Sequence, residues 1–286
     1  MNKIRNVTSV AILMATYNGE KYLREQIDSI LFQTCADWTL YIQDDGSHDH
    51  TLDIIHSYDD ARIVFVDNGL TKQGACMNFM SLLNMVESEY YMFCDQDDVW
   101  FKDKVEKELC RMKEEEMSAS NQSLPIIVHT DRAFVDKTLN VIMPSELNPH
   151  HISADKLSRK MELMKHPSIL AIYTIIGGCT MMMNHAIKEI VFPFINVRMH
   201  DSVCVMAVAN AGGIISTITE PTMYYRIHSS QTCGIGKSGL LPKFLHLFDS
   251  YKRNMRGFYI WKVYGKDSFL RFLYFRIKYF LILRLF

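Results

Sequence analysis

The first hundred residues alternate between short apolar runs and longer segments in which apolar side chains recur every three or four positions. Four runs are short enough to be buried strands, and they occupy residues 10–14, 38–42, 63–66 and 90–94. Between them, helical spacing is found around 23–31, from 51 onward and over 75–86. This alternation predicts an α/β fold with a doubly wound, mostly parallel sheet and helices on both faces.

The middle of the chain predicts further elements of the same kind. The pattern favours a charged helix over 102–117, a strand over 126–128, a helix that begins near His200, and two short strands over 214–218 and 223–227. We therefore expect one domain over 1–233, with a first half near 1–100 and a second half near 125–233.

Carboxylates follow the fourth predicted strand without a gap. Asp95, Asp97 and Asp98 come directly after the apolar run 90–94, at the strand end where open α/β sheets bind their ligands. Neighbouring carboxylates repel one another unless a cation joins them, and hard cations such as Mg²⁺ prefer oxygen ligands. The sequence thus indicates a divalent metal site, with the alternative that Asp98 only caps the following helix.

Charge is distributed unevenly along the chain, although the net charge is only −1. Residues 240–286 hold ten Lys or Arg and two Asp, a net charge of +8, together with 14 of the 33 aromatic residues. The remainder carries −9, which argues against a nucleic-acid partner. The segment 234–286 is expected to be a short linker and an amphipathic helical tail, suited to the headgroup region of an anionic membrane or to packing on the protein.

The cysteines and the apolar runs indicate a cytoplasmic protein. Seven cysteines, an odd number with no C-x-x-C pair, argue against a disulfide framework or a zinc site. The first apolar run is too short for a signal peptide. The uncharged stretch 167–187 is interrupted by polar residues and glycines, so we expect buried core there instead of a membrane span.

Three motifs, taken in their order and spacing, carry a family resemblance. They are Ala15-Thr16-Tyr17-Asn18-Gly19-Glu20, Asp44-Asp45-Gly46-Ser47 and Asp95-Gln96-Asp97-Asp98. Together they resemble glycosyltransferase family 2, whose members are inverting sugar transferases with the GT-A fold. With His200-Asp201 and Tyr225-Arg226-x-His228, the chain looks most like the rhamnosyltransferase-like branch that builds bacterial surface polysaccharides.

The resemblance implies a nucleotide-sugar site in the first half. The residues expected to bind the nucleotide-sugar are Thr16, Tyr17, Asn18, Glu20, Asp45, Asp95 and Gln96. Asp45 would accept the N3–H of uracil or thymine, Tyr17 would pack near the base, and Glu20 could reach the ribose. A Mn²⁺ or Mg²⁺ ion would be held by Asp97, with His228 as a further ligand or as a donor to the diphosphate. A turn explains Asp45 without any ligand, and His228 could simply cap a strand end.

The resemblance places the acceptor in the second half. Asp201 is the candidate general base, with the alternative that it serves as a helix N-cap. Gly177 and Gly178 would let the backbone approach the acceptor, although tight packing explains paired glycines as well. His200 is placed on the same side.

The function that follows is inverting, metal-dependent transfer of a sugar, from dTDP-L-rhamnose in the first instance, to a hydroxyl of a lipid-linked surface glycan. The alternatives are a UDP-hexose or UDP-N-acetylhexosamine donor, and an inactive family member that binds a glycan or a partner protein. The expected location is cytoplasmic, peripheral on the inner face of the cell membrane through residues 240–286.

Overall fold

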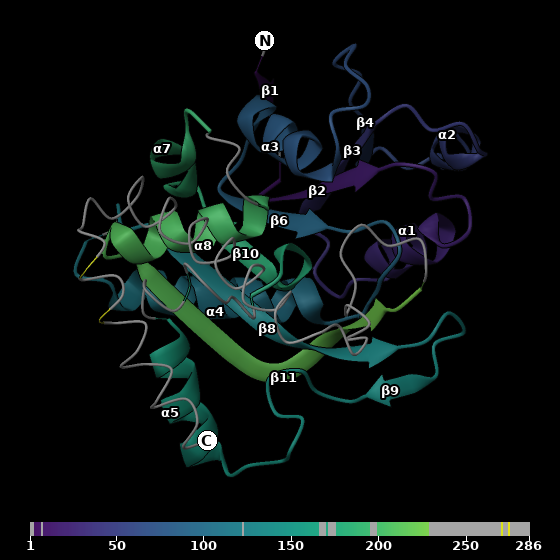
Figure 1. The fold of residues 1–286 in the computed structure, drawn as a ribbon. Coiled ribbons are helices and arrows are strands. Elements are labelled where there is room, and N and C mark those ends of the chain that lie inside the picture. Colours follow the sequence, from purple (N-terminus) through teal and green to yellow (C-terminus); the bar gives the residue numbers. More distant parts are fainter. Residues whose placement is uncertain are drawn as a thin grey trace.

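A nine-stranded mixed sheet forms the centre of the molecule. The structure, a computed structural model, describes residues 3–6, 8–121, 123–165, 170, 176–194, 199–228, 270 and 274. The strands, in their order across the sheet, are β4 (Ile63–Phe65), β3 (Trp38–Asp44), β2 (Val10–Thr16), β6 (Tyr90–Cys94), β10 (Met181–Asn184), β8 (Ile126–Val135), β11 (Ile214–Arg226) and β7 (Val99–Trp100). A further strand, β9 (Val141–Met143), pairs with β8 (Figure 1). β1 (Ile4–Arg5) and β5 (Val86–Glu87) form a separate two-stranded ribbon.

Most of this sheet is parallel, as the sequence predicts. β4, β3, β2 and β6 are mutually parallel, and β8 is parallel to β11. The strand β10 runs antiparallel between β6 and β8. Because β10 reverses the direction twice, the two parallel halves of the sheet point the same way and their carboxyl ends open on one edge.

Helices cover both faces of the sheet, which confirms the predicted layers. One face carries α1 (Leu23–Leu31), α2 (Thr51–His56) and α4 (Lys104–Ser118), packed on Val10, Ile12 and Met14 of β2. The other carries α3 (Ala75–Met85), α7 (Ile187–Val191) and α8 (His200–Asn210), packed on Ala11 and Leu13. A further helix, α5 (Ala154–Met164), follows the β8–β9 hairpin. Successive residues of a strand point to opposite faces, so a continuous apolar run such as 10–14 must be covered on both sides.

Two predictions about the strands of the second half are corrected. The two short strands at 214–218 and 223–227 are one strand, β11, which stays paired with β8 through register shifts around Pro221. A proline has no N–H to give to a ladder, and irregular pairing of this kind accommodates it without ending the strand. The strand predicted at 126–128 continues to Val135, so His129, Thr130 and Asp131 lie within it.

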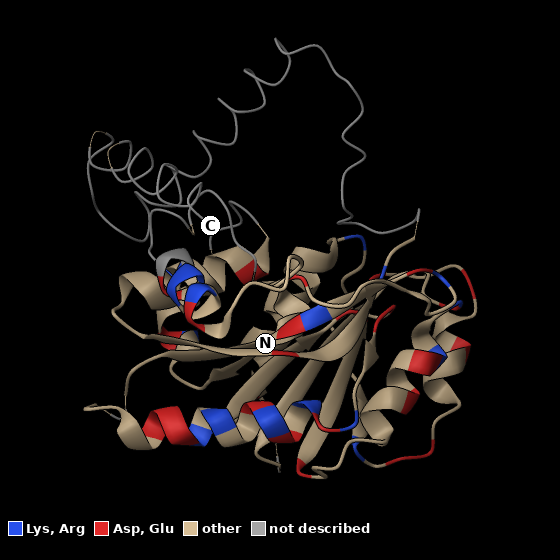
Figure 2. Ribbon diagram, turned by 90° about the horizontal axis from the view of Figure 1, so that it is seen from below, with Lys and Arg blue, Asp and Glu red and all other residues tan. Residues whose placement is uncertain are grey.

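Charge is kept off the sheet. In Figure 2 the Lys, Arg, Asp and Glu residues gather on helices and loops, while the strands are almost entirely uncharged. Among the residues that the structure describes, no helix combines the length and the apolarity that a membrane crossing needs. The predicted linker and basic tail, 234–286, lie outside the described residues except for Leu270 and Tyr274.

Candidate functional site

A cavity of about 730 Å³ opens at the carboxyl ends of the strands. All but one of the predicted site residues line it: Thr16, Tyr17, Asn18, Asp45, Asp95, Gln96, Asp97, Gly177, Gly178, His200, Asp201 and His228. These residues come from positions far apart in the sequence, and it is the parallel arrangement of strands that brings them to one edge.

Glu20 is the predicted residue that does not line the cavity. Its carboxylate accepts the backbone N–H of His50 at 3.0 Å, and its own N–H donates to Asp49 at 3.1 Å. Both partners precede α2. Glu20 therefore ties the first loop to the start of that helix.

Asp44 and Asp45 have separate tasks at the end of β3. Asp44 accepts the Thr16 hydroxyl at 2.8 Å and the backbone N–H groups of Gly46 and Ser47, which fixes the turn. The carboxylate of Asp45 accepts the N–H groups of Gln73 and Gly74, each at 2.8 Å, directly before α3. A carboxylate at a helix N-terminus is stabilised by the unpaired N–H groups there. Asp45 is thus held rigid and ionised, with lone pairs left for a ligand.

The loop after β2 is clamped by Gln96. The side-chain amide of Gln96 accepts the Tyr17 N–H and donates to the Tyr17 carbonyl, both at 2.9 Å. A Cβ on Gly19 would lie 2.3 Å from Oε1 of Gln96, so only glycine leaves room for this pairing. Asn18, at φ 46°, accepts the His48 N–H at 2.9 Å. Tyr17 itself remains half exposed beside the cavity.

The carboxylates after β6 differ in their surroundings. Burial raises the pKa of Asp95 to about 7, and the nearby charges of Asp97 and Asp201 act in the same direction. Asp97 lies 2.7 Å from Nε2 of His228. Asp98 is fully buried; one oxygen accepts the Arg226 N–H at 3.1 Å, and the other has no partner among the described residues. The alternative that Asp98 caps the next helix is wrong, because the cap position of α4 is Asp103.

This cluster fits a divalent cation. Asp95, Asp98 and Cys179 have ligand atoms within 4.8 Å of one another, and Asp97 with His228 borders the same space. Burial raises the pKa of the Cys179 thiol well above its usual range, which keeps it protonated and a poor ligand. Carboxylate oxygens that repel one another, one of them unpartnered, are a donor set for a hard cation.

Arg226 fixes the metal-side loop from behind. Its guanidinium donates to the carbonyls of Asp97 and Lys137, both at 2.9 Å, and pairs with Glu25. It also lies over the Tyr22 ring, 4.5 Å from the centroid. The residue is 1% exposed. Its role here is structural: it joins α1, the carboxylate loop and the end of β11.

Asp201 is the second residue of α8 and faces the cavity. Its predicted alternative as an N-cap is wrong, because the cap position is Met199. His200, one residue earlier, is buried between the rings of Phe79 and Phe93, at centroid distances of 4.4 and 4.7 Å. Burial lowers the pKa of His200, so its ring is neutral. Neither ring nitrogen has a partner among the described residues.

The paired glycines admit two side chains. A Cβ on Gly177 would lie 2.8 Å from Nη1 of Arg132, and a Cβ on Gly178 would lie 2.7 Å from Nε2 of His200. Both distances are too short for a real Cβ. The structure therefore supports the packing explanation for this pair: the glycines let Arg132 and His200 reach the cavity wall.

Three cations of the cavity were not predicted from the sequence. Lys21, Lys72 and Arg132 line it. Lys21 and Lys72 stand next to the first and second motifs, so adjacency was an available signal. Arg132 stands inside a strand, with no motif around it. Asp131, beside it, is occupied elsewhere: its carboxylate accepts the Ser145 hydroxyl and the N–H groups of Glu146 and Leu147.

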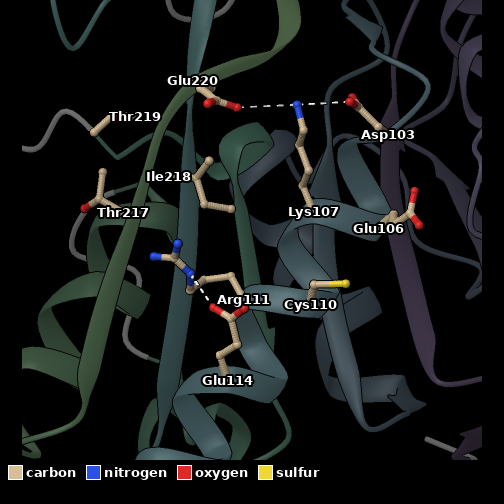
Figure 3. A pocket seen from close by; sticks show the side chains of 10 residues that line it. All are labelled: Asp103, Glu106, Lys107, Cys110, Arg111, Glu114, Thr217, Ile218, Thr219 and Glu220. Carbon is tan, nitrogen blue, oxygen red and sulfur yellow. Dashed lines mark hydrogen bonds and ion pairs between the residues drawn. The ribbon is translucent and has the colours of Figure 1, made fainter.

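A second hollow, of about 510 Å³, lies between α4 and β11 (Figure 3). It contains none of the predicted site residues. Its cations are paired across it: Lys107 with Asp103 at 2.9 Å and Glu220 at 3.6 Å, and Arg111 with Glu114 at 3.0 Å. We find no chemistry there that competes with the strand-end cavity.

Solved structures with the same fold bind nucleotide-sugars. S. aureus TarS 1-349 in complex with UDP-GlcNAc matches with a TM-score of 0.60 at 16% identity, over 89% of this chain and 66% of that chain. The mannosyltransferase PcManGT from Pyrobaculum calidifontis, in complex with GDP-Man and Mn²⁺, matches with a TM-score of 0.56 at 16% identity, over 87% and 64%. At this identity the likeness shows the fold, which is the expected GT-A-like one.

Curated relatives match over shorter stretches. The dTDP-rhamnosyl transferase RfbG of Shigella flexneri is 41% identical over 98 residues, 32% of this chain and 34% of that protein. The Escherichia coli β-1,3-glucosyltransferase WfgD, which is named for UDP-Glc and GlcNAc-diphosphoundecaprenol, is 33% identical over 109 residues, 38% and 43%. The matches thus span less than half the length of these relatives.

The family model described as glycosyl transferase family 2 matches residues 11–191. That range includes β2, the turn after β3, the carboxylates after β6 and the glycine pair, which are the elements that build most of the cavity. The chain therefore belongs to glycosyl transferase family 2.

Proposed function

We propose that this protein is an inverting glycosyltransferase that moves a sugar from a nucleoside-diphosphate donor to a hydroxyl group, with the help of a divalent cation. The observation that carries the proposal is that one cavity is lined by Asp45, by the Asp97–His228 pair and by Asp201. Each of these supplies one requirement of the reaction: base recognition, support for the leaving group, and proton removal.

The base end of the donor is assigned to Asp45 and Tyr17. Asp45 is fixed at the α3 N-terminus by two backbone N–H groups, so its position does not depend on the ligand. A carboxylate with spare lone pairs reads the N3–H of uracil or thymine. Tyr17 offers a half-exposed ring at the same end. Lys72, which also lines the cavity, adds a cation near a polyanionic donor.

The diphosphate end is assigned to the carboxylate loop. Asp97 and His228 would hold the cation, with Asp95 beside them. When bound there, Mn²⁺ or Mg²⁺ neutralises the negative charge that builds up on the departing diphosphate. The chain's own contribution is to hold the loop rigid, through Arg226 behind it and through the Gln96–Tyr17 pairing in front.

Asp201 is assigned the acceptor proton. Inversion requires attack on the anomeric carbon from the face opposite the diphosphate, with a carboxylate on the attacking side to take the proton of the hydroxyl. Asp201 is anchored on the first turn of α8, on an element separate from the metal loop. A base on a rigid helix keeps its distance from the diphosphate site, which suits this geometry.

Partial similarity to a dTDP-rhamnosyl transferase supports dTDP-L-rhamnose as the donor. The relative named for UDP-Glc favours a UDP-hexose, or a UDP-N-acetylhexosamine, as the second candidate. The same relative's name supports a lipid-linked glycan as acceptor. In that case the cytoplasmic, peripheral location and the docking of residues 240–286 on an anionic membrane follow from the basic and aromatic character of that segment. An inactive glycan- or partner-binding protein is the remaining alternative, and the joint presence of Asp45, Asp95, Asp97 and Asp201 in one cavity speaks against it.

Release of nucleoside diphosphate tests the proposal. The protein is incubated with dTDP-L-rhamnose, UDP-glucose or UDP-GlcNAc, each with and without Mn²⁺ and with EDTA. We expect slow hydrolysis of one donor in Mn²⁺, and faster release with a lipid-linked glycan acceptor. No release from any donor would favour the inactive alternative, and full activity in EDTA would remove the metal from the mechanism.

A further inference from the structure

Arg132 is a buried cation at the cavity wall that the reaction as proposed above does not use. It projects from β8, and its side chain is 14% exposed. A positive side chain is not buried at a wall without partners, and those partners show which of its N–H groups are already committed. Resting on the proposed function, the question is which part of the donor or acceptor it meets.

One edge of the guanidinium is saturated. Nε and Nη2 donate to the two oxygens of Glu146 at 2.7 and 3.1 Å, a bidentate pair that fixes the plane of the group and balances its charge. The Tyr225 ring lies 4.3 Å from the guanidinium carbon and holds one face. A charge-balanced, immobilised guanidinium is suited to a neutral hydroxyl-bearing ligand, since an anion would have to compete with Glu146.

The third nitrogen, Nη1, is directed elsewhere. It lies 3.7 Å from Sγ of Cys179, a weak acceptor, and Gly177 leaves space beside it that a Cβ would close at 2.8 Å. Nη1 carries two hydrogens, so it can donate to a ligand in the cavity while it keeps the contact with sulfur.

The position of Nη1 corresponds to the donor sugar. In the proposed reaction the anomeric carbon sits between the diphosphate, at Asp97 and His228, and the base Asp201. The turn at Gly177 and Gly178 connects these two regions: Gly177 touches Arg132, and Gly178 touches His200, the neighbour of Asp201. The ring attached to the anomeric carbon must therefore lie against this turn.

We propose that Arg132 is a specificity-determining residue of the donor-sugar subsite, where Nη1 donates a hydrogen bond to a ring hydroxyl of a neutral sugar. Glu146 and Tyr225 position it. The nucleotide and the diphosphate are bound without its help, because their assigned contacts lie on other elements.

The test separates the sugar from the nucleotide. Binding of UDP, dTDP, UDP-glucose, UDP-GlcNAc and dTDP-L-rhamnose is measured by calorimetry in Mn²⁺, for the full chain and for Arg132→Lys. Lysine keeps the charge but cannot hold the bidentate pair with Glu146 and still reach the same hydroxyl. We expect the preferred nucleotide-sugar to bind about ten- to a hundredfold more weakly, as for a lost hydrogen bond to a charged group. The matching nucleoside diphosphate should keep its affinity within about twofold.

Two further variants make the result specific. Gly177→Ala leaves Arg132 in the chain but crowds Nη1, and should shift sugar binding in the same direction while it spares the nucleoside diphosphate. It also carries the test if Arg132→Lys does not fold, as judged by thermal unfolding. Arg111→Lys is the matched control, because this arginine pairs with Glu114 in the other hollow (Figure 3); it should change neither affinity.

Three results would overturn the inference. The first is an unchanged ratio of nucleotide-sugar to nucleoside-diphosphate affinity in Arg132→Lys. The second is an equal loss for both ligands, which would mean that Arg132 supports the nucleotide or the fold. The third is a raised KM for the acceptor alone. Failure of the wild-type protein to bind any nucleotide-sugar is a different outcome, since it contradicts the proposed function itself.

Discussion

Replacement of Asp201 by asparagine separates catalysis from folding at one position. Asn has the same shape and can still accept a hydrogen bond, but it cannot take a proton. A positioned general base contributes about 10²–10⁴ in rate, which corresponds to roughly 3–5 kcal/mol of barrier at 1.36 kcal/mol per tenfold. We expect Asp201→Asn to lose transfer by that factor.

The structural cost of the same change is small. Asp201 lies in the first turn of α8, where a negative charge stabilises the helix by about 0.3–1 kcal/mol. The expected loss of stability is therefore several times smaller than the expected rise in the barrier. Donor affinity should be unchanged or slightly raised, because one negative charge near Asp95 is removed.

The assay is single-turnover transfer at saturating donor and Mn²⁺, together with urea unfolding and calorimetric donor binding. Asp155→Asn is the control, because Asp155 is an exposed carboxylate in the first turn of α5 and outside the cavity. It should lose a similar amount of stability and no activity. Transfer at the wild-type rate by folded Asp201→Asn would refute the assignment of the base.

Three further predictions concern the metal, the core and the tail. Asp97→Asn should abolish turnover and weaken Mn²⁺-dependent donor binding, with little rescue by excess Mn²⁺; wild-type kinetics would contradict this. Burial lowers the pKa of His129 from 6.5 to about 3, so the folded state binds this proton less readily than the unfolded state and stability falls as the pH drops below 6.5. Between pH 7 and pH 5 His129→Gln should lose about 2 kcal/mol less unfolding free energy than the wild type in urea titrations, and parallel pH profiles would refute this. Truncation before Leu240 should leave donor binding intact but release the protein from anionic vesicles in a sedimentation assay, unless the full-length protein ignores such vesicles at low salt.

The donor half of the site was accessible to sequence reasoning because its signals are local. Asp45 and Asp97 follow apolar runs directly, and the ends of parallel strands must meet at one edge of the sheet. The roles within the motifs were harder to assign. Glu20 turns toward His50, and the Asp98 carboxylate is buried against the Arg226 N–H, since backbone partners far along the chain decide where each carboxylate points.

The sugar side could not be predicted in the same way. Arg132 stands in a strand whose alternation carries no sign of a site, and its place in the cavity depends on contacts with Glu146 and Gly177 from other elements. The continuity of β11 was missed for a related reason. Pro221 and its polar neighbours are typical of a turn, but β8 pairs with them through a register shift.

The central claim is that the strand-end cavity is a nucleotide-sugar site, and thermal unfolding across a panel of donors tests it most directly. A ligand at 100 times its Kd stabilises the folded state by about 2.7 kcal/mol. We predict such stabilisation by a dTDP- or UDP-sugar in Mn²⁺, reduced by EDTA and lost in Asp45→Ala. Unfolding transitions that do not move with any donor, in the presence of Mn²⁺ and at millimolar ligand, would contradict the account.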